Sequence, residues 1–388
     1  MTKRLFDHPT PPWEADAVVT GCTAAGENWA VALDRTVFFP RGGGQEGDRG
    51  VIGDSAVYNT VEQDGAILHL CNAPVEAGKT VHIAVDRACR FDRMQNHTAE
   101  HLLCGILHNQ YGFDNVGFAL NDSCVTLDIN GVLSTEQLTE AEGRANELIC
   151  ENRAVTVSFP TAKQLSALSY RSKSELTGQV RLVEIQGVDL CACCAPHVSS
   201  TGQIGSLRIT DAMHYKGGMR LTMLAGMRAL RYHQQLDAQN RGISRLLCVK
   251  PEQTCSGVER LIQENEALRS RAGSLERQMA ELLAAQTAPG TENPCLLIPQ
   301  LGPGAQRQLL RDLCEKCRGV CVLLCGDDTQ GYRYLIGSRE IPLRVQTSAI
   351  NQALRGKGGG SDEMLQGTFS ASFAEITAFF RGFSPADP

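Results

Sequence analysis

Two histidines four residues apart form the clearest candidate for chemistry in this sequence. His97 and His101 lie in residues 96–107, which carry apolar side chains at helical spacing. One turn of helix separates the two, so both imidazoles lie on one face and present nitrogens to a common point. Zinc binds imidazole nitrogen at about 2.0–2.1 Å, but a zinc site needs more ligands than this helix supplies. By itself the spacing fits ordinary core or solvated histidines equally well.

A cysteine-rich segment much further along the chain supplies further ligands. Residues 189–198 read Asp-Leu-Cys-Ala-Cys-Cys-Ala-Pro-His-Val, so a thiol and an imidazole lie close together in the sequence. Cys193 and His197, added to His97 and His101, give the mixed nitrogen and sulfur set that Zn²⁺ accepts. We therefore predict one zinc site built from these four residues.

The remaining cysteines point to packing. The chain has sixteen cysteines, mostly scattered through apolar runs as buried free thiols are, so no disulfide framework is expected. Cys314 and Cys317 form the other concentration, but no histidine lies near them, and packing is a better explanation than a second zinc. The first residues contain no apolar signal-like run, and no 18 apolar residues follow one another. We expect a cytoplasmic protein with no membrane segment.

Charge is distributed unevenly. The net charge of −6 argues against a protein that coats nucleic acid nonspecifically. Residues 163–245, however, hold eleven Lys or Arg against five acids, a net +6. This window is either a footprint for a polyanion, with Arg220 among its candidate contacts, or an ordinary solvated surface.

The positioning elements predict an α+β multidomain protein. With 388 residues and 42% apolar content, we expect several cores and divide the chain into 1–90, 91–228, 229–288 and 289–388. Short strands separated by turn residues predict a small β-barrel in the first part. They are expected at residues 17–20, 29–33, 57–61, 66–70 and 81–85. Within this barrel, Gly42, Gly43 and Gly44 precede Gln45, where backbone turns sharply or approaches another group closely.

The second part predicts a two-layer α+β domain. A helix is expected from Asp92 to Tyr111, followed by paired strands at 116–120 and 124–129. A second helix starts at Thr135, capped by Ser134 or Thr135 itself. A strand is expected at 155–159, and another at 180–185 leads into the cysteine-rich segment.

The third and fourth parts predict a helical segment and a small α/β domain. Within 229–288 an apolar seam alternates steps of four and three, which fits an antiparallel helical hairpin or a dimerising coiled coil. The seam residues are Leu261, Asn265, Leu268, Ala272, Leu275, Met279 and Leu282. Strands and helices alternate beyond 289. There, the run Gly358, Gly359 and Gly360 either admits a ribose-phosphate backbone or makes a tight loop.

These motifs carry a resemblance to a known family. The pair His97-x-x-x-His101, followed by Cys193-x-x-x-His197 and preceded by the Gly-Gly-Gly-Gln45 loop, resembles the editing domain of alanyl-tRNA synthetases and of AlaX-type alanyl-tRNA editing proteins. That match covers residues 1 to about 231. The run from Gly356 to Gly367 resembles the glycine-rich signature of the DHH-associated domain that ends alanyl-tRNA synthetases. The whole chain is thus similar to the long form of AlaX.

The resemblance implies a zinc-dependent aminoacyl-tRNA deacylase. Its substrate would be tRNA(Ala) mischarged with serine, or with glycine, captured in trans because no aminoacylation domain precedes the editing half. The resemblance points to Gln45, Thr98 and Glu100 as the catalytic or serine-sensing residues. It points to substrate contacts at Gly42, Gly43 and Gly44. Contacts to tRNA are also expected at Arg220, from the basic window, and at Gly358, Gly359 and Gly360, from the second glycine run. A homodimer through 229–388 is a further expectation.

Some alternatives stay open. The family commonly reads Cys-Gly-Gly-Thr-His where this chain has Cys194, Ala195 and Pro196 between its outer residues. Cys194 and Cys191 are therefore substitute ligands, packing residues or redox-sensitive thiols. His197 is a permanent ligand or one that yields to water. The rival functions are a tRNA-binding regulatory protein with a structural zinc, and a deacylase for another misacylated tRNA. A DHH-type phosphodiesterase lacks its Asp-His-His tripeptide here.

Overall fold

The protein is a mixed α/β chain that divides into two compact units. The computed structural model describes residues 2–172 and 179–383. One unit spans Met1–Arg241 and the other Gly242–Pro388. The mixed α/β, multidomain class expected from the sequence is confirmed, whereas the finer division into four domains stays a prediction. None of the described helices combines the length and apolar character that crossing a bilayer requires.

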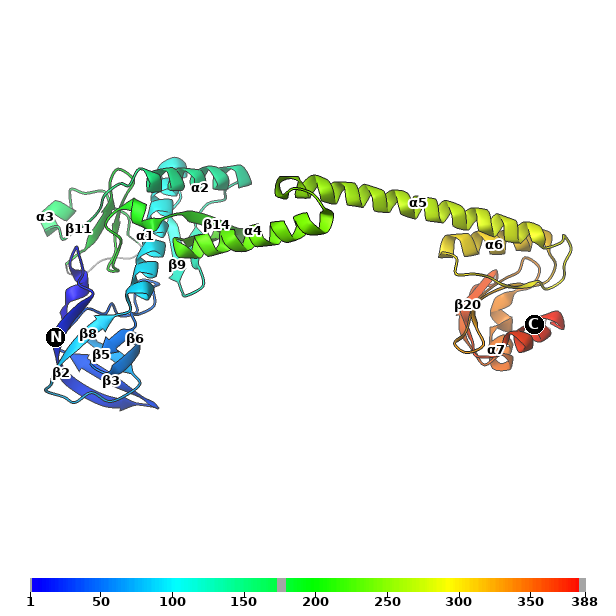
Figure 1. Ribbon diagram of the computed structural model, residues 1–388, viewed down its shortest axis with the longest axis horizontal. Helices are drawn as coiled ribbons and strands as arrows, with labels where there is room; N and C mark the ends of the chain where they lie inside the picture. Colours follow the sequence, from blue (N-terminus) through cyan, green and yellow to red (C-terminus); the bar gives the residue numbers. More distant parts are fainter. Residues whose placement is uncertain (1, 173–178, 384–388) are drawn as a thin grey trace. The chain divides into compact units, whose positions relative to one another are not determined.

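The first unit begins with six strands that close into a barrel in the order β2-β3-β7-β6-β5-β8 (Figure 1). These strands are β2 (Glu14–Ala25), β3 (Asn28–Leu33), β5 (Gly50–Ile52), β6 (Ser55–Gln63), β7 (Ala66–Cys71) and β8 (Thr80–Val85). Val19, Val31, Ile52 and Ile83 point inward and fill it. Beside it, β1 (Lys3–Arg4) pairs in parallel with β4 (Arg35–Thr36).

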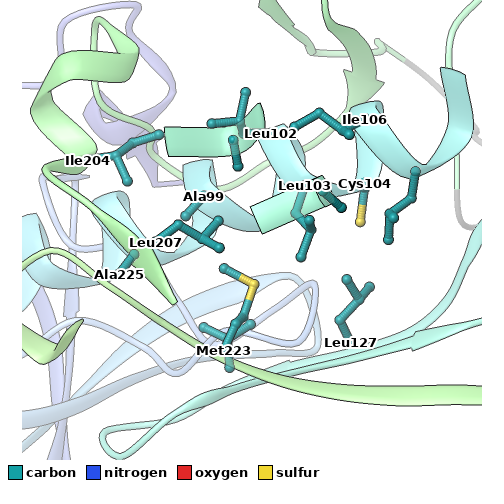
Figure 2. Packing of buried hydrophobic residues seen from close by; sticks show 14 of the residues in the cluster. Ala99, Leu102, Leu103, Cys104, Ile106, Leu127, Ile204, Leu207, Met223 and Ala225 are labelled. Carbon is teal, nitrogen blue, oxygen red and sulfur yellow. The ribbon is translucent and has the colours of Figure 1, made fainter. Parts of the chain in front are cut away.

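Helix α1 (Arg87–Tyr111) is the central element of the first unit. Its prediction from Asp92 is wrong at the start, because Asp86 caps the helix by accepting a hydrogen bond from the Cys89 backbone N–H. Gly112 ends it in the left-handed conformation with φ 70°. Figure 2 shows its residues 99–106 packed among buried side chains from several other elements.

Two antiparallel sheets pack with α1. A four-stranded sheet has the order β14-β15-β10-β9, and a three-stranded sheet has the order β11-β12-β13. The strands are β9 (Asn115–Leu120), β10 (Val125–Ile129), β11 (Val155–Ser158), β12 (Leu182–Ile185), β13 (Asp189–Ala192), β14 (Leu207–Tyr215) and β15 (Gly218–Ala225). Helix α2 (Thr135–Cys150) carries a capping box at Ser134, and α3 (Ala162–Leu165) is one turn long. One hydrophobic core joins α1, α2 and both sheets.

Helix α4 (Met227–Leu247) carries the chain from the first unit into the second. The second unit contains α5 (Thr254–Gln286) and a five-stranded sheet of order β16-β17-β18-β20-β19. Its remaining elements are β16 (Cys295–Leu297), α6 (Pro303–Lys316), β17 (Cys321–Asp327), β18 (Gly331–Gly337), α7 (Leu343–Ala353), β19 (Gly356–Gly360), β20 (Met364–Phe369) and α8 (Phe373–Arg381). The predicted hairpin pairing of α5 stays a prediction, and its seam residues Leu261, Leu268 and Leu282 are exposed.

The glycine run of the second unit corrects a sequence prediction. Residues 356–360 form the edge strand β19 rather than a loop. A Cβ on Gly358 would collide with the Tyr334 hydroxyl, and one on Gly356 would approach the Phe369 ring at 2.7 Å. Tyr334 and Phe369 stack 4.0 Å apart beneath the strand. The absence of side chains therefore lets the edge strand lie on these rings, whereas a Cβ on Gly359 would meet open space.

Candidate metal centre

The four predicted ligands converge although they come from two distant segments. The ligand atoms of His97, His101, Cys193 and His197 all lie within 4.8 Å of one another. The Cys193 Sγ is 3.6 Å from His97 Nε2 and 3.3 Å from His197 Nε2. The three histidines are almost completely buried. This donor set, three imidazoles and one thiol around one point, fits the preference of zinc.

The Nδ1 of each imidazole, the nitrogen that is not directed at the other ligands, lies against a supporting side chain. The Nδ1 of His97 lies 2.8 Å from the Gln45 Oε1. The Nδ1 of His101 lies 3.2 Å from the Asp189 Oδ2. The Nδ1 of His197 lies 3.0 Å from the Thr98 Oγ1. Metal-binding histidines are oriented by such contacts, which leave Nε2 as the ligand nitrogen. The supporting residues are therefore Gln45 for His97, Asp189 for His101 and Thr98 for His197.

The segment that carries Cys193 and His197 is fixed by backbone contacts. The Arg181 guanidinium is buried and donates from Nη1 to the carbonyls of Cys193, at 2.7 Å, and Ala195, at 2.8 Å. The Val198 N–H donates to the Thr98 hydroxyl at 3.2 Å. Thr98 lies one residue after His97, so this contact ties the segment to α1. The thiol and imidazole therefore face the α1 histidines without relying on regular secondary structure.

A tight glycine turn places Gln45 beside the centre. Gly42 and Gln45 exchange two backbone hydrogen bonds of 3.0 Å, and Gly43 and Gly44 between them have φ of 56° and 82°. The Gly44 carbonyl accepts from the Leu120 N–H at 2.7 Å, which joins the turn to β9. Gln45 is 1% exposed, and within the described chain its Nε2 has no hydrogen-bond partner. An amide donor is thus buried next to the presumed ligands.

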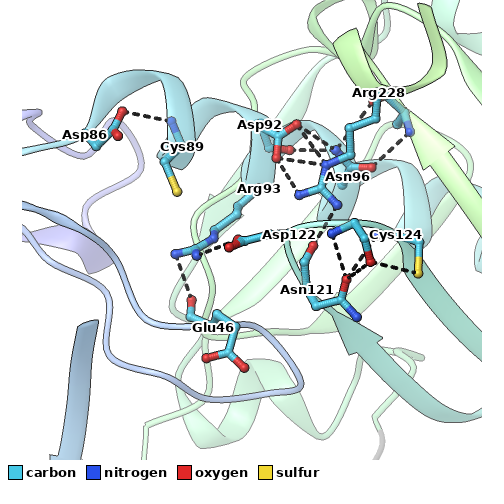
Figure 3. Close-up of polar contacts among 12 residues, drawn as sticks. Glu46, Asp86, Cys89, Asp92, Arg93, Asn96, Asn121, Asp122, Cys124 and Arg228 are labelled. Carbon is cyan, nitrogen blue, oxygen red and sulfur yellow. Dashed lines mark hydrogen bonds and ion pairs between the residues drawn. The ribbon is translucent and has the colours of Figure 1, made fainter. Parts of the chain in front are cut away.

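Two buried arginines of α1 hold the rest of this loop. Arg90 donates to the Asp48 carboxylate, at 2.8 Å from Nε, and to the Val37 carbonyl at 2.7 Å. Arg93 donates to the Gly47 carbonyl at 2.5 Å. Figure 3 shows Arg93 also reaching Asp122 and the backbone of Glu46. The barrel loop is therefore bound to the same helix that carries the histidines.

The electrostatics of the centre favour a thiolate. Burial opposes ionisation of Cys193, yet the neighbouring His97 and His197 hold the pKa of its thiol well below its usual value. Burial lowers the pKa of the His197 imidazole to about 3. Burial also disfavours the imidazolium of His101, but hydrogen bonding to Asp189 raises its pKa well above the usual value. A metal would therefore compete with a proton for His101.

The catalytic candidates fall into different environments. The Thr98 hydroxyl donates to the Met94 carbonyl at 2.7 Å in addition to its contact with His197, so its bonds serve to position that ring. Glu100 is buried, and its Oε1 accepts hydrogen bonds from Asn115 and, at 3.1 Å, from Cys104. Its Oε2 lies 3.8 Å from His101 Nε2, the nitrogen that faces the centre.

The neighbouring cysteines differ from Cys193. Cys194 is exposed, and its Sγ would lie 3.7 Å from a Cβ on Gly43. Burial of its sulfur by the surrounding groups raises the pKa of the Cys194 thiol to about 11. Cys191 is buried and belongs to a second group of possible ligands, with His101 and Asp189. No group of possible ligands among the residues described includes Cys194, Cys314 or Cys317.

Five of the eleven basic residues in the 163–245 window form ion pairs with carboxylates of the described chain. Arg220 forms a two-pronged ion pair with Asp128, 2.6 and 2.7 Å long, and lies 3.8 Å over the Tyr215 ring. Arg171, Arg208, Arg228 and Arg241 also pair with carboxylates. Figure 3 shows the pair of Arg228 with Asp92. These arginines are engaged internally, and Lys173 lies outside the described residues.

Several residues at the centre were not predicted from the sequence. They are Asp189, Arg171, Arg181, Arg90 and Asp48. Asp189 gave one local signal, a charged residue at the start of the cysteine-rich segment. The arginines gave none, because their partners lie far away in the sequence.

Comparison with known proteins defines the class. Residues 180–246, which include Cys193 and His197, match the threonyl and alanyl tRNA synthetase second additional domain. Residues 15–89 match the class II (A) tRNA synthetases. The two matches cover most of the barrel and the segment that carries Cys193 and His197, so these two parts of the chain are similar to parts of aminoacyl-tRNA synthetases.

Individual relatives sharpen this result. The alanyl-tRNA editing protein AlaX-L of Pyrococcus horikoshii is 25% identical over 97% of this chain and 96% of its own length. The alanyl-tRNA editing protein Aarsd1-A of Xenopus laevis is 32% identical over 68% of this chain and 64% of its own. An alanine--tRNA ligase of Ignicoccus hospitalis is 30% identical over 74% of this chain and 33% of the ligase. The resemblance to long-form alanyl-tRNA editing proteins is confirmed.

Proposed function

We propose that this protein is a trans-editing hydrolase that cleaves the aminoacyl ester of tRNA(Ala) mischarged with serine or glycine. The observation that carries the proposal is the convergence of His97, His101, Cys193 and His197 beside the buried amide of Gln45. The similarity to alanyl-tRNA editing proteins over nearly the whole chain supports the substrate class. A deacylase of this type serves translation, and we place it in the cytoplasm.

The four donors would hold Zn²⁺, and the flanking groups would act on the substrate. Bound zinc polarises an ester carbonyl or lowers the pKa of a water toward about 7. The Gln45 Nε2 donates a hydrogen bond to the aminoacyl group while its Oε1 holds His97. The Glu100 Oε2, near His101 Nε2, accepts a proton from the attacking water. Thr98 keeps His197 in its ligand orientation.

Serine selectivity follows from a polar site. An apolar alanine pocket rejects an added hydroxyl by only about a hundredfold, so the synthetase reaction needs correction. A site built to bond the serine hydroxyl rejects alanine by about 10⁴ to 10⁵, because alanine leaves a buried polar group unpaired. The Gln45 Nε2 is a buried donor that would be satisfied by serine and left unpaired by alanine.

The tRNA would be held by surfaces outside the centre. We assign the turn of Gly42, Gly43 and Gly44 to the aminoacylated end. Arg220 and the segment 229–388, with the strand that carries Gly358, Gly359 and Gly360, we assign to the tRNA body or to a homodimer. Contacts to phosphates make affinity fall as salt rises.

The experiment compares deacylation of seryl-, glycyl- and alanyl-tRNA(Ala) by the native protein and by two variants of one helix. His97→Ala removes a proposed ligand. His108→Ala removes an exposed histidine on the same helix that pairs only with Asp114 among the residues described. We expect seryl-tRNA(Ala) to be cleaved and alanyl-tRNA(Ala) spared, with activity lost in His97→Ala and kept in His108→Ala.

Other results would assign a different function. Equal rates on seryl- and alanyl-tRNA(Ala) would remove the editing assignment. Binding of tRNA(Ala) without deacylation of any charged form would support a regulatory protein with a structural metal. Deacylation confined to another misacylated tRNA would change the substrate but not the chemistry.

A further inference from the structure

Asp189 occupies a distinctive position among the groups that hold the imidazoles. It starts β13, its side chain is buried, and its Oδ2 lies 3.2 Å from His101 Nδ1. His97 and His197 are held by neutral groups, the Gln45 amide and the Thr98 hydroxyl. Of the three imidazoles, only His101 has a carboxylate at its Nδ1 within the described chain. A carboxylate beside an imidazole attracts a proton to the nearer ring nitrogen more strongly than a neutral group does.

A single arginine fixes the carboxylate. Arg171 donates from Nε to Asp189 Oδ1 at 2.6 Å and from Nη2 to Oδ2 at 2.9 Å. The Arg171 backbone is held too, since its N–H donates to the Leu190 carbonyl at 2.8 Å and its carbonyl accepts from the Ala192 N–H at 2.9 Å. A two-pronged pair leaves the carboxylate little freedom to rotate. The Asp189 Oδ2 therefore stays directed at His101.

Gly105, on the same face of α1 as the histidines, allows Asp189 to approach His101 closely. Gly105 lies one turn after His101 on α1, in register with both histidines. A Cβ there would lie 2.8 Å from the Asp189 Cβ and 2.8 Å from the Val188 carbonyl oxygen. The absence of this side chain lets β13 lie against the helix. The sequence His97, His101, Gly105 thus encodes two ligands and the contact that holds one of them.

We propose that Asp189, clamped by Arg171, is the positioning residue that fixes His101 in its metal-binding tautomer and orientation. With its proton on Nδ1, 3.2 Å from the Asp189 Oδ2, the imidazole presents Nε2 to Cys193 and the other ligands. The inference rests on the proposed metal-dependent function, and it adds the charged support that distinguishes His101 from the other two imidazoles.

Zinc affinity of the full chain tests this role without reference to activity. Affinity is measured by competition with a chromogenic chelator, and the ligand field is followed by the visible spectrum of the Co²⁺-substituted protein. Asp189→Asn is expected to weaken zinc binding by about 10- to 100-fold while keeping one site per chain. The matched control is Asp128→Asn, which breaks a similar fork with Arg220 on β10. Its zinc affinity and Co²⁺ spectrum are expected to equal those of the native chain.

A second variant keeps the test decisive if Asp189→Asn does not fold. Arg171→Lys retains the positive charge but loses the fork, and it is expected to weaken zinc binding several-fold. Native affinity and an unchanged Co²⁺ spectrum in either folded variant would overturn the inference. Loss of the site at saturating zinc in Asp189→Asn would make Asp189 a ligand and also overturn it. A native chain that binds no zinc would instead remove the metal from the proposed function.

Discussion

Two groups of cysteines in this protein contain the same residue type in opposite settings. In the first unit, Cys193 faces three imidazoles that come from a helix and from its own segment. In the second unit, Cys321 is hydrogen-bonded to Cys314 and Cys317, and these sulfurs pack in an apolar cluster with Leu310. No possible metal-ligand group within the described residues includes any of those three thiols. Cysteine density alone therefore does not mark a metal site, whereas convergence of mixed donors does.

The two glycine-rich segments show the same contrast. Gly43 and Gly44 adopt left-handed conformations in a turn that buries an amide beside the ligands. Gly358 is in an extended edge strand, where it makes room for the Tyr334 ring. In both places glycine permits a close approach. The approach serves the proposed site in one unit and packing in the other.

The largest difference between cysteines is expected at two adjacent residues, Cys193 and Cys194. Cys193→Ala is expected to lose stoichiometric zinc and to reduce deacylation by more than about 100-fold, because a charged ligand is removed. Cys194→Ala is expected to keep about one zinc per chain, because its sulfur is not among the converging donors. Metal analysis of the purified variants measures both. Zinc retained in Cys193→Ala and lost in Cys194→Ala would reverse the assignment.

The pH at which each thiol is alkylated further distinguishes these cysteines. A depressed pKa makes a thiol react at lower pH, so alkylation of Cys193 by iodoacetamide in the metal-free protein is expected to begin at a lower pH than alkylation of Cys194. Alkylation of Cys314 is also expected to begin at a lower pH than that of Cys194, because its hydrogen bond with Cys321 and the nearby Arg339 lower the pKa of its thiol. Cys194, with a pKa of about 11, reacts only as pH approaches that value.

Zinc separates the two reactive thiols. Peptide mapping by mass spectrometry is expected to show that zinc protects Cys193 and leaves the alkylation of Cys314 unchanged. Protection of Cys314 by stoichiometric zinc would place a metal in the second unit. Alkylation of Cys193 that zinc leaves unaffected would remove it from the ligand set.

A smaller effect distinguishes neighbouring glycines of β19. Gly358→Ala is expected to destabilise the protein by about 1–3 kcal/mol, because its Cβ collides with the Tyr334 hydroxyl and the Gln366 carbonyl. Gly359→Ala meets open space and is expected to leave stability unchanged. Thermal unfolding measures both. Weaker tRNA binding by a fully stable Gly359→Ala would support a backbone contact at this strand, and equal destabilisation by both variants would contradict the packing explanation.

Local patterns predicted the elements better than the contacts between them. The spacing of His97 and His101 encodes a shared face, and Ser134 predicted the start of α2, because both signals depend on neighbours within one or two turns. For the glycine run, the prediction of a tight loop was wrong, because glycine has low strand propensity but other forces act on this segment. Pairing with β20 and packing on Tyr334 outweigh that preference.

Local sequence patterns did not predict the residues that hold the candidate metal centre together. Arg181 donates to carbonyls more than ten residues away, and Arg90 reaches Asp48 across 42 positions. Such contacts depend on the completed fold, and no local pattern of the sequence encodes them. Helix α1 starts before the expected Asp92 because the Asp86 carboxylate caps it by accepting a hydrogen bond from the Cys89 N–H.

Zinc K-edge X-ray absorption of the zinc-loaded full chain tests the central claim most directly. Three imidazoles and one thiolate predict three nitrogen scatterers at about 2.0–2.1 Å and one sulfur at about 2.3 Å. If His197 yields to water, the sulfur stays and an oxygen replaces one nitrogen at a similar distance. A shell with two or more sulfurs, or with none, would contradict a centre built from His97, His101, Cys193 and His197.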